Sequence, residues 1–159
     1  KGMPLEQVRQ MFSQVSGAAA EVGVEIDFDT VIAANTFDAH RLVHLAGARG
    51  EDLVEALFHA HFVEGDVVDD RETLVRIAAS AGLDADLVRA ALESDAAADA
   101  VRADLLAARQ LGVTGVPFFV ANRAVAVSGA QPEDVFLALL QRAIEDVDSE
   151  EDQSVRDAR

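Results

Sequence analysis

Helical periodicity, interrupted by glycines and acidic caps, governs the first 111 residues of this chain. Apolar residues recur three or four positions apart, as they do on the buried face of an amphipathic helix. The first such segment covers residues 5–22, and its apolar positions are Leu5, Val8, Phe12, Val15, Ala19 and Val22. Gly23 follows as a stop signal. The pattern predicts a mostly α-helical chain.

Five further helices are expected before Gly112. They cover residues 36–46, 51–64, 71–81, 85–93 and 95–111, after a short extended segment at 24–28 in which apolar and acidic residues alternate. Four of these helices have a predicted N-cap, because the side-chain oxygens of Ser, Thr and Asp accept hydrogen bonds from free backbone amides. In chain order the caps are Thr36 for the first, Asp69 or Asp70 for 71–81, Asp84 for 85–93, and Ser94 or Asp95 for the last. The expected inward side chains are Phe37, Leu42 and Leu45, with His44 as a further candidate, and then Leu53, Val54, Leu57, Phe58 and Phe62.

The pattern changes after Gly112. Phe118-Phe119-Val120 is a short apolar run, typical of a strand buried on both faces. Asn122-Arg123 predicts a turn and residues 124–128 a second strand, so we expect a β-hairpin. A last helix is expected over 132–146, with Val135, Leu139, Leu140 and Ile144 inward, before a charged tail expected to be disordered. A two-stranded hairpin alone is a poor sheet. We therefore expect the apolar strand at 118–120 to lack further neighbouring strands within this chain.

Composition excludes several function classes. The chain has no cysteine, which removes disulfides, thiolate zinc sites and a cysteine nucleophile. Its net charge of -16 argues against nucleic-acid binding and against docking on anionic lipid, since both need Lys and Arg. No apolar run approaches the roughly 18 residues of a membrane span. With no signal-peptide pattern at residues 1–7, we expect a cytoplasmic protein.

The segment Gly115-Val116-Pro117 stands directly before the apolar strand. Proline cannot donate to a strand ladder and therefore belongs at a strand start, where an X-Pro bond can be cis. A cis bond there turns the amide and carbonyl of Val116 outward, toward an extended peptide. The plainer alternative is a helix–strand connection in which Pro117 only ends the preceding segment.

Three motifs occur in a characteristic order. They read Asn35-Thr36-Phe37-Asp38-Ala39-His40-Arg41-Leu42, then Gly112-Val113-Thr114-Gly115-Val116-Pro117-Phe118-Phe119-Val120, then Val127-Ser128-Gly129-Ala130-Gln131-Pro132. With a helical block between the first two, the chain resembles the FrnE-like branch of the DsbA family from about residue 3 to about residue 145. The resemblance implies an α/β, thioredoxin-like fold of the DsbA type with a large helical insertion. In that scheme residues 1–111 are the insertion region, 112–146 the C-terminal ββα part, and 147–159 the acidic tail.

The resemblance also implies what the chain lacks. The family's fold opens with a strand, a Cys-x-x-Cys motif at a helix start and a second strand, and this chain matches only the insertion and the closing half. We therefore expect a fragment or truncated form of a thiol–disulfide oxidoreductase, not redox-active alone and with no catalytic residue, cofactor or metal. Gly115, Val116 and Pro117 are the expected binding loop for a protein or peptide substrate.

Two other functions stay open. The related kappa-class glutathione transferases and 2-hydroxychromene-2-carboxylate isomerases share the insertion, and in them glutathione lies by the cis-Pro loop and a Ser-Asp pair. Here the matching place reads Gly129-Ala130-Gln131, which disfavours glutathione. The other alternative is a non-catalytic interaction module, in which the bare edge of the 118–120 strand pairs with a partner or a second copy as a homodimer.

The histidines are weak candidates for a metal site. His40 and His44 are four residues apart, a spacing that can bind metal, but two ligands are incomplete and we expect a partly buried structural role for His40. His59 and His61 lie two residues apart and are expected to be a surface and a boundary residue.

The remaining polar candidates have structural explanations. Four acids surround one predicted helix start, namely Asp66, Asp69, Asp70 and Glu72. A general acid–base pair is conceivable there, but capping is the favoured interpretation. Ser128 has no His-Asp arrangement in view, so a serine hydrolase is disfavoured.

Overall fold

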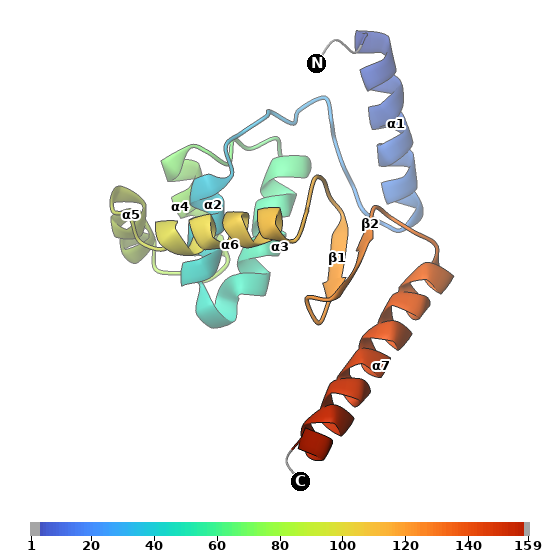
Figure 1. The fold of residues 1–159 in the computed structure, drawn as a ribbon. Helices are drawn as coiled ribbons and strands as arrows, with labels where there is room; N and C mark the ends of the chain where they lie inside the picture. The colour runs from blue at the N-terminus through green and yellow to red at the C-terminus, as the bar shows by residue number, and fades with distance from the viewer. Residues whose placement is uncertain (1–3, 158–159) are drawn as a thin grey trace. The chain divides into compact units, whose positions relative to one another are not determined.

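A computed structural model describes the backbone of residues 4–157 and the side chains of residues 4–145. The elements are α1 (Leu5–Glu21), α2 (Phe37–Leu45), the 3-10 turn η1 (Gly47–Arg49), α3 (Gly50–Phe62), α4 (Arg71–Ser80), α5 (Ala85–Glu93), α6 (Ala98–Gln110), β1 (Phe118–Ala121), β2 (Val125–Ser128) and α7 (Glu133–Asp157) (Figure 1). The chain divides into a helical unit, Lys1–Ala103, and a hairpin unit, Asp104–Arg159. None of the described helices is both long and apolar enough to cross a membrane.

The core of the helical unit is built from four consecutive helices. In it α2 packs on α3, α3 on α4 and α4 on α5. Each contributes one fully buried leucine, and these are Leu42, Leu53, Leu74 and Leu92. Burying a side chain of this size stabilises the fold by about 1.5–3 kcal/mol. The predicted helices therefore share one core.

The inward faces differ in part from the prediction. The buried residues of α3 are Leu53, Leu57 and Ala60, whereas Phe58 is 55% exposed. The residues predicted to face inward on α3 belong to two adjacent faces of the helix. Leu53, Leu57 and Ala60 form the face that is directed at the core. Leu45 at the end of α2 is also exposed, which corrects its predicted inward position.

Two of the four predicted helix caps are present in the structure. Asp70 accepts a bond from the Thr73 amide at 2.8 Å, and Asp84 caps α5 in the same way, which confirms both. Thr36 precedes α2 but makes no side-chain cap bond. Instead the Asn35 side-chain oxygen accepts from the Phe37 amide at 3.0 Å, an Asx turn that asparagine forms readily.

Two segments differ from their predicted secondary structure. Helix α6 begins at Ala98 rather than at Ser94 or Asp95, because Ser94 Oγ accepts from the Ala96 amide and Ala97 adopts a left-handed φ of 57°. Residues 24–28 form no strand, since no described strand pairs with them. Their apolar positions serve packing instead, and the Phe28 ring stacks on Phe12 with centroids 4.4 Å apart.

The hairpin unit contains the predicted two strands, and α7 packs against them. The register pairs Phe118 with Ser128 and Ala121 with Val125. Asn122 and Arg123 both have positive φ, as a type I′ turn requires. Phe136 of α7 meets Phe119 edge to face at 4.8 Å.

Burial in the hairpin unit is lower than predicted. Phe119 and Val120 stay exposed, because a two-stranded sheet offers little cover. Among the α7 side chains that the structure describes, Glu133 to Glu145, the buried residue is Ala143, and Leu140 and Ile144 are exposed, contrary to their predicted inward positions. The helix also continues to Asp157 through most of the segment expected to be a disordered tail, since residues 146–157 contain neither Gly nor Pro to end it.

Candidate functional site

The candidate loop begins where α6 ends. Gly112 adopts a φ of 75°, and the Val113 amide donates back to the Ala108 carbonyl at 3.0 Å. This left-handed cap is the usual way for a helix to end with its last carbonyls satisfied. The glycine thus ends the helix and begins the connection to β1.

Gly115, Val116 and Pro117 lie together on the surface of the hairpin unit. The Val116–Pro117 peptide bond is cis, and the Pro117 carbonyl accepts from the Gly129 amide at 2.8 Å. That bond continues the β1–β2 ladder one residue beyond the Phe118–Ser128 pair. The loop is therefore attached to the sheet at Pro117.

Val116 is the most exposed large apolar residue of the described part of the chain, at 90%. Among the described residues, no hydrogen bond uses its amide or its carbonyl. Each such group has an unmet capacity for a partner. Val116 thus offers one donor and one acceptor on the approach to β1, which is the form in which an extended peptide is recognised.

The segment after β2 folds onto itself. Gln131 donates from its side-chain amide to the Ser128 carbonyl at 3.0 Å, and both Ala130 and Gln131 are exposed. Ser128 belongs to β2 opposite Phe118. The Gln131 side chain is thus engaged in closing the turn that precedes α7.

The four histidines do not assemble a metal site. His40 and His44 are both exposed on α2, so the expected partial burial of His40 is wrong. Within residues 4–145, no group of three or more His, Asp or Glu side chains is placed to hold a metal ion. His59 is exposed, with Nδ1 3.6 Å from Oε1 of Glu64. His61 is half-buried and donates from Nδ1 to the Asp66 carbonyl. These are the surface and boundary positions predicted for the two residues.

The acids around the start of α4 are each engaged structurally. Asp69 accepts from the Asn35 amide at 3.0 Å, and Asp66 and Glu72 pair with Arg76 and Arg89. The hydrogen bond to Asp66 raises the pKa of Arg76, and the hydrogen bonds to Glu72 raise the pKa of Arg89.

The fourth acid, Asp70, is the cap of α4. The Thr73 backbone amide donates to its carboxyl group and lowers the pKa of that group. Capping and pairing thus account for all four acids, with no need of a general acid–base pair.

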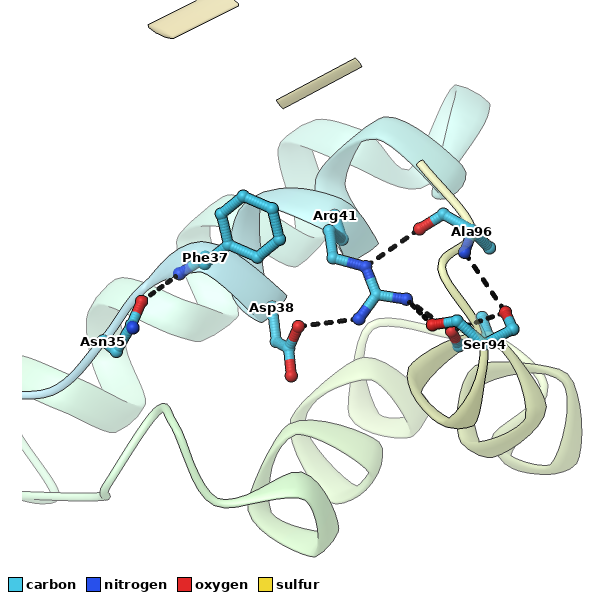
Figure 2. Close-up of polar contacts among 7 residues, drawn as sticks. Asn35, Phe37, Asp38, Arg41, Ser94 and Ala96 are labelled. Carbon is cyan, nitrogen blue, oxygen red and sulfur yellow. Dashed lines mark hydrogen bonds and ion pairs between the residues drawn. The ribbon is translucent and has the colours of Figure 1, made fainter. Parts of the chain in front are cut away.

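Sequence reasoning missed a buried arginine. Arg41 is 4% exposed on α2, and its guanidinium bonds to Asp38 and to the carbonyls of Ala91, Ser94 and Ala96 (Figure 2). The Asp38–Arg41 spacing was visible in the first motif, but the three carbonyls carry no side-chain signal. We call this group the Arg41 clasp, and it ties α2 to the α5–α6 turn.

Comparison with known proteins places this geometry in a family. The model of the DSBA-like thioredoxin domain matches residues 2–141. The chain belongs to the DsbA-like thioredoxin domain family. The predicted fold class, a DsbA-type fold that is mostly helical and closes with a hairpin and a helix, is thereby confirmed.

One solved structure gives the scale of the likeness. The crystal structure of a probable DsbA oxidoreductase from Streptomyces coelicolor is 44% identical to this DsbA-like chain, with a TM-score of 0.83. The match covers 91% of this chain and 63% of that one, so the chain spans less than two thirds of its relative. No curated protein matches the chain.

Proposed function

We propose that this DsbA-like chain is the helical insertion and C-terminal part of a FrnE-like thiol–disulfide oxidoreductase that acts on protein thiols. Family membership and the 44% identity to a probable DsbA oxidoreductase support the class. The three sequence motifs support the FrnE-like branch, with the cytoplasm as the proposed compartment.

This proposal requires a reactive sulfur from outside the 159 residues. Disulfide exchange begins when a thiolate attacks a disulfide sulfur and expels the other sulfur as a thiolate, through a mixed disulfide. The 159 residues contain no cysteine. In this proposal a Cys-x-x-Cys unit outside the sequence supplies the nucleophile, and the present chain supplies substrate binding.

The observation that carries the binding role is the unpaired backbone of Val116. An extended substrate segment would accept from its amide and donate to its carbonyl, with Gly115 permitting close approach and Pro117 fixed to the sheet. Such recognition uses the main chain and depends little on the side chain at residue 116.

A matched pair of variants tests this loop. Val116→Ala keeps the amide, whereas Val116→Pro removes it, and binding of an unstructured 12-residue peptide is followed by amide NMR. We expect Val116→Ala to bind within about threefold of the original chain and Val116→Pro about tenfold more weakly, at the upper end of what the loss of one hydrogen bond allows. Equal binding by both variants contradicts the role of the Val116 backbone.

The redox class is tested separately. We expect the coding sequence upstream of residue 1 to encode a strand–CxxC–helix–strand unit, and the joined protein to reduce insulin disulfides while the 159-residue chain does not. Fractionation of cells locates the joined protein and tests the cytoplasmic compartment. An upstream region without the cysteine pair would exclude the oxidoreductase proposal and leave the peptide-binding result standing.

The exposed hairpin favours one second candidate, a non-catalytic module that pairs with another copy. The described sheet has two strands, and Phe119 and Val120 are exposed on β1. Bare strand edges template pairing. Sedimentation should then show a dimer that Val120→Lys dissociates, and a monomer at high concentration would refute this candidate. No observation favours the glutathione-dependent alternative, because Ala130 and Gln131 replace the Ser-Asp pair.

A further inference from the structure

An apolar pocket of about 270 Å³ lies within the helical unit, between α2 and α3. Ala39, Leu57 and Val68 belong both to its lining and to the buried core. The pocket is therefore backed by the buried core of the unit. It includes no residue of the proline loop, so it is independent of the proposed function.

One wall of this pocket is aromatic. Phe58 and Phe62 lie with ring centroids 6.1 Å apart, and the His61 ring meets Phe62 edge to face at 4.8 Å. Phe58 is 55% exposed although it is a large apolar side chain. Aromatic rings prefer offset or edge-to-face neighbours at these separations, so a flat ring suits the wall.

The polar groups of the lining can accept a hydrogen bond. His61 donates from Nδ1 to the Asp66 carbonyl, so Nε2 is the ring nitrogen left to accept a hydrogen bond. The His40 imidazole, on the other lining helix, has no bonding partner in the part of the chain that the structure describes. Apart from the histidines, the lining contains no ionisable side chain. A hydroxyl group on a bound ring could therefore donate to an imidazole.

Charge selects against an anionic ligand. The chain carries a net charge of -16, and a carboxylate would enter against that field with no Lys or Arg in the lining. Size limits the ligand as well, since a cavity of about 150 Å³ accommodates benzene. We propose that the α2–α3 pocket binds a small neutral phenol with one ring and a short alkyl substituent, through the aromatic wall and an imidazole acceptor.

The test uses the full chain and 4-ethylphenol, with ethylbenzene as the matched ligand without the hydroxyl. Methyl NMR of Val43 and Leu57 follows both ligands, and the absence of Trp and Tyr lets phenol fluorescence provide an independent titration. We expect saturable one-to-one binding of the phenol, about fivefold tighter than ethylbenzene, as one hydrogen bond allows. If His61 accepts the hydrogen bond, His61→Phe should remove the preference for 4-ethylphenol over ethylbenzene. If His40 accepts it, His40→Phe should remove that preference.

Filling variants locate the site. Val43→Phe and Val54→Phe each place a ring in the pocket and should weaken binding at least about tenfold. Leu87→Phe, at a residue that is 72% exposed and outside the pocket, is the control and should change nothing. Circular dichroism checks that each variant is folded, and two filling variants are made in case one is not. Unsaturable binding, equal affinity for the two ligands, or full binding by a folded filling variant would overturn the proposal.

Discussion

The Arg41 guanidinium and the Asp38 carboxylate lie 2.7 Å apart, one turn from each other on α2. Arg41 is buried, and its Nε and Nη2 atoms donate to three backbone carbonyls around the α5–α6 turn. A buried charge is tolerated when it is paired and its donors are satisfied. The Arg41 clasp meets both conditions and joins segments 50 or more residues apart.

Replacing Arg41 should be costly. Arg41→Met leaves Asp38 and the carbonyls without their donor, and we expect the free energy of unfolding to fall by about 3 kcal/mol. Urea unfolding followed by circular dichroism measures the change. Arg49→Met is the control, because the Arg49–Asp52 pair is exposed and should contribute within about 0.5 kcal/mol. Equal effects of the two variants would refute the clasp.

Gly65 should not tolerate a side chain. It has a φ of 71°, and an added Cβ would lie 2.8 Å from Thr30 Cβ. We expect Gly65→Ala to destabilise by about 2 kcal/mol, the sum of backbone strain and overpacking. Gly47→Ala is the matched control, with φ also positive and nothing within 4 Å, and should cost only about 1 kcal/mol. Equal losses in thermal unfolding would show that the contact with Thr30 adds nothing.

The Phe12–Phe28 stack should hold α1 to the segment that follows it. The rings lie 7° from parallel, and α1 has no buried residue. We expect Phe28→Leu to speed hydrogen exchange of the α1 amides by roughly three- to tenfold, as the loss of about 1 kcal/mol allows. Exchange in α4 should not change. A double-mutant cycle with Phe12→Leu should give a coupling of about 0.5–1.5 kcal/mol, and additive effects would count against the stack.

Asp70 should make stability depend on acid. Its pKa is lowered in the folded chain by the bond from the Thr73 amide. Because the folded pKa lies below the unfolded one, the stabilisation is complete above the unfolded value of about 3.9 and is lost as the pH falls through the folded value. Asp70→Asn keeps the cap without the titration, so its unfolding midpoint should vary less between pH 5 and pH 2. An unchanged acid profile would contradict this assignment.

The hairpin turn should be improved by glycine at one position and not at the other. Arg123 has a φ of 58°, so Arg123→Gly should stabilise the hairpin by about 0.5–1 kcal/mol. Asn122 also has positive φ, but its side chain donates to the Ala143 carbonyl at 2.7 Å, and Asn122→Gly loses that bond. Hydrogen exchange of the Val120 and Val127 amides measures both. Equal protection in the two variants would mean that the Asn122 bond contributes nothing.

Local signals in the sequence predicted local structure well. Asp70 and Asp84 cap helices because their partners lie within three residues, and the Asn122-Arg123 turn follows from the strands on either side. Gly115, Val116 and Pro117, which the motif predicts as a binding loop, lie together on the surface, and their binding role stays a prediction.

Long-range features could not be predicted in this way. The acceptors of Arg41 are backbone carbonyls, which look the same at every position of a sequence. The exposure of Phe58 depends on which of two neighbouring faces of α3 meets α2 and α4, and periodicity alone does not choose between them. The α2–α3 pocket follows from that same choice.

The Arg41 clasp also has a consequence for sequence divergence. Its acceptors at Ala91, Ser94 and Ala96 are peptide carbonyls, so any residue there that preserves the turn can serve. Position 41 is different, because no other side chain carries five N–H donors on a planar, permanently charged group. Substitution should therefore be tolerated at residues 91, 94 and 96, which contribute backbone carbonyls, but not at residue 41. Two related chains could keep the same clasp while sharing only its arginine and its acid.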